Sequence, residues 1–327
     1  MTVQPKIAVL FTNLGTPDAC QVSSVRKYLK EFLSDPHVVD LPKWLWLPFL
    51  YGFVLPLRAV KSAKMYQKIW TENGSPLKVN MNKLIVQLKN YFSNYQQNIS
   101  IFLSMRYGEP SLESILSTIS SEGFDKLILF PLYPQYSIAT TRSTVNKVSE
   151  ILSKLDYHPE IQIINHYYDN AEYISAIADS IQTAISLYHP EKIMFSFHGL
   201  PEKFITQKND PYVEHCKATV KLITEKLQLP KDKWILSFQS RFGKAKWVKP
   251  YTDVELINLA QQNIKNICVI CPGFSVDCLE TLEEINIQNR KLFLDAGGKE
   301  YHYIPCLNDD DEHVQMLANI VLKSIEG

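Results

Sequence analysis

Seven short apolar runs, rich in β-branched residues, recur along the chain and constrain its fold more than any other feature. Amphipathic stretches of helical length separate them, and no Gly/Ser-rich linker intervenes. The runs are 7–11, 99–103, 127–132, 161–164, 193–197, 234–238 and 267–270. Strands that are apolar throughout, rather than at alternate positions, are typical of parallel sheets covered by helices on both faces. We therefore predict a doubly wound, Rossmann-like α/β fold.

Two parts of the chain show the same order of elements. Residues 103–108 read Leu-Ser-Met-Arg-Tyr-Gly and residues 238–243 read Phe-Gln-Ser-Arg-Phe-Gly, and each motif links a strand through a helical stretch to another strand. Chance similarity of two strand ends is the alternative to a duplication. We expect two similar domains, at 1–155 and 156–327, the second closed by a C-terminal helix. Because open α/β sheets bind ligands beyond the carboxyl ends of their strands, both domains should face one cleft.

Composition excludes several classes of protein. The 34 basic and 34 acidic residues give a net charge of +0, whereas nucleic-acid binders usually carry a basic excess. Six cysteines in 327 residues form no disulfide framework, which favours a reducing cytoplasm, and the N-terminus lacks the pattern of a signal peptide. Cys268 and Cys271 have the spacing of a zinc or redox pair. They lie within an apolar run, however, and a buried strand is the favoured interpretation.

Residues 44–57 form an uncharged apolar segment with two tryptophans and two prolines. The segment is shorter than the roughly 20 apolar residues that a membrane-spanning helix needs. Three interpretations remain: a buried helix, the apolar lip of a ligand pocket, or a patch that touches a membrane. Tryptophan and tyrosine favour the headgroup level of a bilayer, which keeps the third interpretation open.

Two groups of residues are candidates for chemistry. His198 ends the run 193–197, where an α/β fold presents functional side chains, although a lone histidine is often structural. Asp277, Glu280 and Glu284 fall on one face of a predicted helix, with no basic residue in their row to relieve their repulsion. Such a row suits a cation or a proton relay. A solvated acidic face at a helix N-terminus is the alternative.

A third segment, 237–253, interleaves aromatic and basic residues. That composition suits a flat, apolar ligand that carries carboxylates. It also suits nucleic acid, but the neutral net charge and the absence of an RNA-binding motif argue against it.

Eight motifs, in order and almost from end to end, resemble the ferrochelatase family. They are Asn13-Leu-Gly-Thr-Pro17, Gly74-Ser-Pro76, Met105-Arg-Tyr107, Tyr133-Pro-Gln-Tyr-Ser137, Ser196-Phe-His-Gly-Leu-Pro201, Gln239-Ser-Arg-Phe-Gly243, Trp247 with Pro250-Tyr-Thr252, and Asp277-Cys-Leu-Glu-Thr-Leu282. The resemblance covers residues from about 7 to about 310. It implies the two-domain chelatase fold, with a porphyrin cleft, and insertion of ferrous iron into protoporphyrin IX in haem biosynthesis, with release of two protons.

The resemblance also implies roles for individual residues. His198 and Glu280 match the catalytic pair associated with iron and with proton removal. Asp277 and Glu284 belong to the acidic row, a proton or metal relay in which Gln288 replaces a frequent carboxylate. The positions that match porphyrin contacts are Leu14, Arg58, Ser75, Arg106, Tyr107, Tyr133, Trp247 and Phe274.

Departures from the family pattern refine this expectation. Members with an iron–sulfur cluster bind it through one internal cysteine and a C-terminal cysteine group. Ile138 occupies the internal position here, so we expect no [2Fe-2S] cluster and no other permanently bound cofactor. Coproporphyrin-using members tend to carry tyrosine where this chain has Leu14, which resembles the protoporphyrin-using group.

Competing functions are a coproporphyrin chelatase, a cobalt chelatase for a corrin precursor, and a haem or metal carrier of the same fold. We expect a cytoplasmic enzyme that touches the inner face of the membrane weakly and peripherally, and that does not bind nucleic acid.

Overall fold

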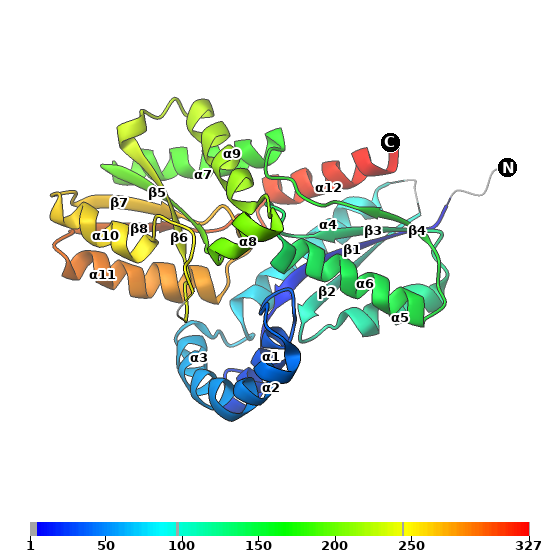
Figure 1. Ribbon diagram of the computed structural model, residues 1–327. Helices are drawn as coiled ribbons and strands as arrows, with labels where there is room; N and C mark the ends of the chain where they lie inside the picture. The colour runs from blue at the N-terminus through cyan, green and yellow to red at the C-terminus, as the bar shows by residue number, and fades with distance from the viewer. Residues whose placement is uncertain (1–4, 96–97, 244, 327) are drawn as a thin grey trace. The chain divides into compact units, whose positions relative to one another are not determined.

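The computed structural model describes residues 5–95, 98–243 and 245–326. The chain divides into two compact units, each of which holds one parallel sheet (Figure 1). The first comprises Met1–Tyr133, Ser137–His166 and Asp309–Gly327. The second comprises Pro134–Tyr136 and Tyr167–Asn308. Both sheets confirm the predicted α/β class.

The first unit is built on a four-stranded sheet of order β2-β1-β3-β4. Its strands are β1 (Ile7–Gly15), β2 (Ile99–Tyr107), β3 (Lys126–Pro131) and β4 (Glu160–Ile163). Ile7 of β1 is in register with Ile99 and with Lys126, so β1 is hydrogen-bonded along both edges. That position buries its apolar residues on both faces, as the sequence indicated.

Helices cover both faces of this sheet. On one face, Leu10 packs in a core with Leu116 of α5 and Val148 of α6. On the other, the side-chain amide of Asn13 lies 3.5 Å from the sulfur of Met81 in α4. The helices of this unit are α1 (Val22–Leu33), α2 (Lys43–Phe49), η1 (Leu50–Val54), α3 (Leu55–Ile69), α4 (Pro76–Ser93), α5 (Leu112–Glu122), η2 (Ile138–Arg142), α6 (Ser143–Lys154) and α12 (Asp311–Glu326).

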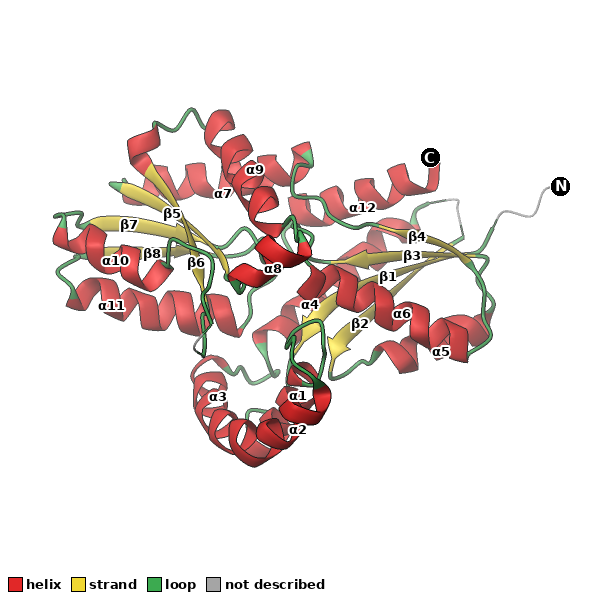
Figure 2. Cartoon of the chain, viewed as in Figure 1, coloured by secondary structure: helices red, strands yellow, loops and turns green. Residues whose placement is uncertain are grey.

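The second unit repeats this plan with a sheet of order β6-β5-β7-β8. Its strands are β5 (Lys192–His198), β6 (Trp234–Gln239), β7 (Asn266–Ile270) and β8 (Glu300–Ile304). Its helices, shown in red in Figure 2, are α7 (Ala171–Tyr188), α8 (Glu202–Lys208), α9 (Tyr212–Lys226), η3 (Lys231–Lys233), α10 (Thr252–Gln261), η4 (Glu280–Asn289) and α11 (Arg290–Asp295). Helices α10 and α11 pack on one face through a core that includes Leu259, Phe293 and Val269.

Two expectations need correction. The structure contains an eighth strand, β8, whose sequence Glu-Tyr-His-Tyr-Ile alternates because it is an edge strand. The domain boundaries also differ from 1–155 and 156–327: the first unit includes the C-terminal helix α12. That helix packs on α4, where Gln87 donates a hydrogen bond of 2.7 Å to the carbonyl of Asp309.

The apolar segment 44–57 is helical, formed by α2, the π-helical turns of η1 and the start of α3. The buried-helix interpretation holds for two residues of this segment, Leu50 and Leu55. Trp44 and Leu57 are each 75% exposed and Phe53 is 64% exposed. Within the described residues, no helix has both the length and the apolar character needed to cross a bilayer.

The Cys268–Cys271 pair lies in the core, as expected for a strand. Cys268 belongs to β7, and both side chains are buried. Burial raises the pKa of the Cys268 thiol to about 12, far from the thiolate that binds zinc. No cluster of three or more His, Cys, Asp or Glu residues suited to a metal ion occurs in the described part of the chain.

The ends of β1 and β2 approach so closely that only glycine fits between them. A Cβ atom on Gly15, whose φ is +105°, would lie 1.8 Å from the carbonyl oxygen of Tyr107. Gly74 has a similar φ of +111° but no atom within 4 Å of that position. Substitutions at these two glycines can therefore be compared. At Gly15 a side chain meets both a backbone clash and a positive φ, whereas at Gly74 it meets only the positive φ.

We predict that Gly15→Ala destabilises the protein by about 4 kcal/mol or more, since the clashing atom is backbone and cannot rotate away. Gly74→Ala should cost about 1–3 kcal/mol, because it introduces only the strained φ. Urea unfolding of both variants measures the difference. Equal losses would show that the close approach of the two strands does not constrain the fold.

Candidate active site

His198 is the last residue of β5, the strand that pairs with both β6 and β7. Its ring is half-buried, and its Nδ1 lies 2.7 Å from the carbonyl oxygen of Gly199. A carbonyl only accepts hydrogen bonds, so Nδ1 carries the hydrogen of the neutral ring. The lone pair of the imidazole is then on Nε2, where a proton can be accepted.

Gly199 and Trp247 fix the backbone beside the histidine. The amide of Gly199 donates to the carbonyl of Gln239 at 2.8 Å. A Cβ atom on Gly199 would lie 2.8 Å from that oxygen and 3.2 Å from the Trp247 ring. The Trp247 ring is buried and donates through its indole nitrogen to the carbonyl of Phe242 at 2.9 Å. The glycine of the His-Gly pair is thus required by packing.

Of the predicted acidic row, Glu280 and Glu284 lie in η4, a π-helix, whereas Asp277 precedes the helix and does not share its face, contrary to the prediction. The wider turn of a π-helix brings residues four apart, such as Glu280 and Glu284, close to one line. Gln239 and Ser240, at the end of β6, hold this helix. The side-chain amide of Gln239 donates to the backbone carbonyl of Glu280 at 3.2 Å. The backbone N–H of Ser240 donates to the Glu284 carboxylate at 2.8 Å, and the Ser240 hydroxyl donates to its other oxygen.

Glu284 is suited to proton exchange near neutral pH. Burial raises the pKa of its carboxyl to about 7, although the two hydrogen bonds from Ser240 lower it. The negative charges of Glu280 and Asp253 raise it further. Perturbed carboxyl groups of this kind gather at functional sites.

Asp277 and Gln288 have local partners. The Asp277 carboxylate accepts hydrogen bonds from Thr281 at 2.8 Å, Tyr303 at 2.6 Å and Asn308 at 2.8 Å. Gln288 donates to the carboxylate of the buried Glu283. Glu280, the first residue of η4, is half-buried, and Phe274 is half-buried between β7 and η4 in the sequence.

The predicted porphyrin contacts of the first unit, except Arg58, lie near the carboxyl ends of its strands. Arg106 and Tyr107 end β2 and share the carboxylate of Asp35, at 2.5 and 2.7 Å. Ser75 accepts a hydrogen bond of 2.8 Å from the hydroxyl of Thr16, directly after β1. Leu14 lies near the end of β1, Tyr133 follows β3, and Arg58 lies half-buried in α3.

Sequence reasoning missed three residues of these networks: Asp35, Ser143 and, as a partner of Glu284, Ser240. Ser240 belongs to a quoted motif, and its φ of +65° marks a backbone kept in the left-handed region without glycine. The sequence gives weaker grounds for selecting Asp35, which only stands before a proline and after a helical stretch. Lys244, within the basic and aromatic segment 237–253, lies outside the described residues.

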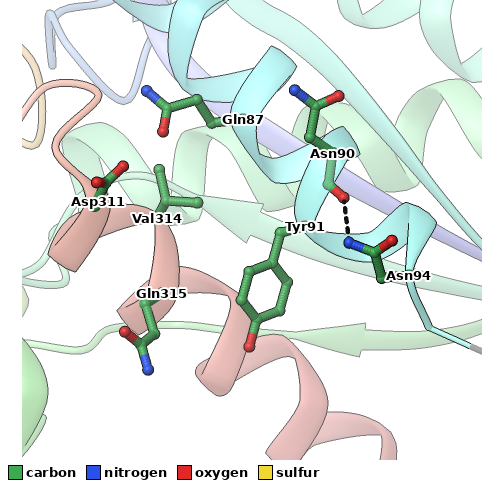
Figure 3. Close-up of a pocket in the computed structure, with 7 residues that line it drawn as sticks. All are labelled: Gln87, Asn90, Tyr91, Asn94, Asp311, Val314 and Gln315. Carbon is green, nitrogen blue, oxygen red and sulfur yellow. Dashed lines mark hydrogen bonds between the residues drawn. The ribbon is translucent and has the colours of Figure 1, made fainter.

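A pocket of about 400 Å³ in the first unit is distinct from these residues (Figure 3). It lies between α4 and α12 and contains mainly carboxamides. Its lining residues are Gln87, Asn90, Tyr91, Asn94, Asp311, Val314 and Gln315. No predicted site residue belongs to it, so we do not place the chemistry there.

Comparison with known proteins agrees with the sequence motifs. The ferrochelatase family model matches residues 6–325. The chain is 46% identical to "Ferrochelatase 2" of Shewanella oneidensis, over 97% of both chains. It is 45% identical to the ferrochelatase of Mannheimia succiniciproducens, over 97% of this chain and 98% of that protein.

Among solved structures, SirB from Bacillus subtilis with Fe3+ has a similar fold. The TM-score is 0.57 at 12% identity, over 98% of this chain and 95% of that one. The structure of CbiX, described as the terminal enzyme of sirohaem biosynthesis in denitrifying bacteria, gives 0.51 at 10% identity, over 98% of both chains. At such low identity these likenesses support the two-domain fold alone. The family match and the relatives decide the function: the chain belongs to the ferrochelatase family, the lyases that insert iron into a porphyrin in haem biosynthesis.

Proposed function

We propose that this ferrochelatase inserts ferrous iron into protoporphyrin IX, with His198 as the acceptor of pyrrole protons and Glu280 and Glu284 as the groups that receive iron or carry protons away. The main support for the proposal is the hydrogen bond that the His198 ring makes. Its Nδ1–H is committed to the Gly199 carbonyl, which leaves a basic Nε2 at the end of the paired strand β5.

The chemistry requires a base and a weak metal site. Two pyrrole protons must leave, and a neutral imidazole accepts protons at physiological pH. A site that transfers its metal should bind it weakly enough for release, and imidazole with carboxylate suits ferrous iron better than thiolates do. Glu280 is half-buried next to Glu284, whose pKa of about 7 suits proton transfer.

Protoporphyrin is the proposed substrate because of what the first unit exposes. Protoporphyrin has two propionates and a largely apolar periphery. Leu14 occupies the position where a tyrosine is typical of coproporphyrin-using members, and residues 44–57 expose apolar side chains in the same unit. We also propose that the enzyme works without a resident cluster, since the side chain of Ile138, in η2, cannot ligate iron.

We predict that His198→Ala lowers metallation by 10²–10⁴-fold, the usual contribution of a general base. Protoporphyrin binding, followed by fluorescence, should change little. His302→Ala is a matched control, because His302 stacks on Tyr188 in the same unit and should be dispensable for turnover. Near-normal turnover by a folded His198→Ala protein would remove histidine from the mechanism.

Glu284 should make stability depend on pH. Its pKa is about 7 when folded and near 4.5 when unfolded, so its stabilising contribution is complete below pH 4.5 and is lost as the pH rises to 7. Glu284→Gln stays neutral, so it should exceed the wild type in unfolding free energy at pH 8 by up to about 3 kcal/mol, and by much less at pH 5. The exposed Glu214→Gln is the control. A difference that does not vary with pH would contradict the raised pKa.

We further propose a cytoplasmic enzyme whose segment 44–57 contacts a membrane peripherally. The rings of Trp46, Phe49 and Phe53 lie against one another at 5.7–6.0 Å between centroids, on a surface that also exposes Trp44 and Leu57. Basic residues flank this surface, among them the exposed Lys43, Lys61 and Lys64. Aromatic rings at headgroup depth and lysines near anionic lipid both favour such a contact.

Replacing Trp44 and Leu57 with serine should weaken co-sedimentation with anionic vesicles about tenfold or more, because burial of an apolar side chain contributes about 1.5–3 kcal/mol. Leu187→Ser, which removes a 65% exposed leucine from the other unit, is the control. Unchanged sedimentation of the double variant would refute the membrane contact and leave the chelatase function intact.

A further inference from the structure

We propose that Asp35 is a positioning residue for porphyrin binding, because its buried carboxylate fixes Arg106 at the end of β2. The inference rests on the proposed function, in which Arg106 lies on the porphyrin wall of the first unit. It concerns a residue in the loop after α1, outside all eight family motifs quoted above.

The Asp35 carboxylate joins three segments of the first unit. One oxygen accepts from the Arg106 guanidinium at 2.5 Å, the Tyr107 hydroxyl at 2.7 Å and the Ser143 hydroxyl at 2.6 Å. The other accepts from the backbone N–H of His37 at 2.7 Å and lies 2.9 Å from its Nδ1. The end of β2, the start of α6 and the loop 34–42 therefore meet at one side chain.

This carboxylate acts as a permanent charge. Its side chain is only 3% exposed, and burial alone would raise its pKa. The hydrogen bonds from Ser143, His37 and Tyr107, together with the charge of Arg106, instead lower the pKa to about 2. Asp35 therefore stays ionised at working pH, which fits electrostatic fixation of Arg106 and not proton transfer.

Arg106 has hydrogen-bonding capacity that the described residues leave unused. A guanidinium has five N–H donors. Nε donates to Ser143 at 2.9 Å and one donor of Nη2 to Asp35, while the guanidinium carbon lies 4.5 Å from the centre of the Tyr107 ring. The side chain is 11% exposed, and its other three donors have no partner among the described residues. Donors that lack a protein partner can bind a ligand or water.

Asp35 determines where those donors lie. Removing its charge weakens the hydrogen bond that holds Nη2 and the hydrogen bond from Tyr107, against which the guanidinium packs. Arg106 then has several rotamers of similar energy, and porphyrin binding must select one of them. The expected effect is on porphyrin affinity, with metal affinity unchanged.

The test is a double-mutant cycle on the dissociation constant of protoporphyrin, measured by fluorescence without metal. Asp35→Asn should raise this Kd about tenfold in the wild-type background and less than twofold in an Arg106→Lys background, because the effect passes through Arg106. An equal fold-increase in Kd in both backgrounds would overturn the proposal. A general loss of packing would weaken porphyrin binding to the same extent whether or not Arg106 is present. The KM for ferrous iron should not change in Asp35→Asn, and a rise in parallel with the porphyrin Kd would also overturn the proposal.

Two further variants keep the test decisive. Glu113→Gln breaks a half-exposed ion pair with Lys147 in the same unit and should leave the Kd unaltered. If Asp35→Asn does not fold, Ser143→Ala removes one donor to Asp35 and the acceptor of the Arg106 Nε, and should raise the Kd about threefold. No change in Ser143→Ala would then refute the proposal. Porphyrin binding without iron insertion by the wild type would instead refute the proposed function.

Discussion

The hydrogen bonds between the end of β6 and the π-helix η4 are the interaction on which the site of the second unit depends. Gln239 binds the helix backbone at Glu280, and Ser240 binds the Glu284 carboxylate twice. The backbone carbonyl of Gln239 accepts the N–H of Gly199, the residue after His198. The end of β6 therefore holds both the residue beside the histidine and the acidic helix.

The left-handed φ of Ser240 is understandable in this light. A non-glycine residue in that region is strained by about 1–2 kcal/mol, and glycine would avoid this cost. Glycine, however, lacks the hydroxyl that donates to Glu284. The strain is offset by a second hydrogen bond to a carboxylate whose burial already raises its pKa. The first unit uses an analogous arrangement at the end of β2, where Asp35 joins Arg106, Tyr107 and Ser143.

Much of the fold followed from apolar runs, because a parallel strand buried on both faces has a simple sequence pattern. All seven predicted strands are present. β8 was missed because its alternating pattern, Glu300 to Ile304, is that of a half-exposed edge. The membership of α12 in the first unit could not be predicted, since it depends on contacts with α4, more than 200 residues earlier in the sequence.

Candidate site residues could be named from the sequence where a residue type carries its own chemistry, as in His198 and the acidic row, and their roles stay predictions. Their supporting contacts could not be named in this way. The partners of Asp277 and the hydrogen bonds of Asp35 join residues distant in sequence, and only the folded chain brings them together. Segment 44–57 shows that apolar composition alone does not decide burial. An apolar sequence predicts a buried segment, yet Trp44 and Leu57 are exposed.

Anaerobic absorbance spectroscopy of the purified enzyme tests whether it inserts iron into protoporphyrin IX catalytically. Ferrous iron is mixed with protoporphyrin IX or with coproporphyrin, each in large molar excess over the enzyme. The loss of free porphyrin is then followed with time. The proposed function predicts repeated turnover, with protoporphyrin consumed at the higher kcat/KM. Faster consumption of coproporphyrin would contradict the assigned substrate, and a reaction that stops after one equivalent would contradict catalysis itself.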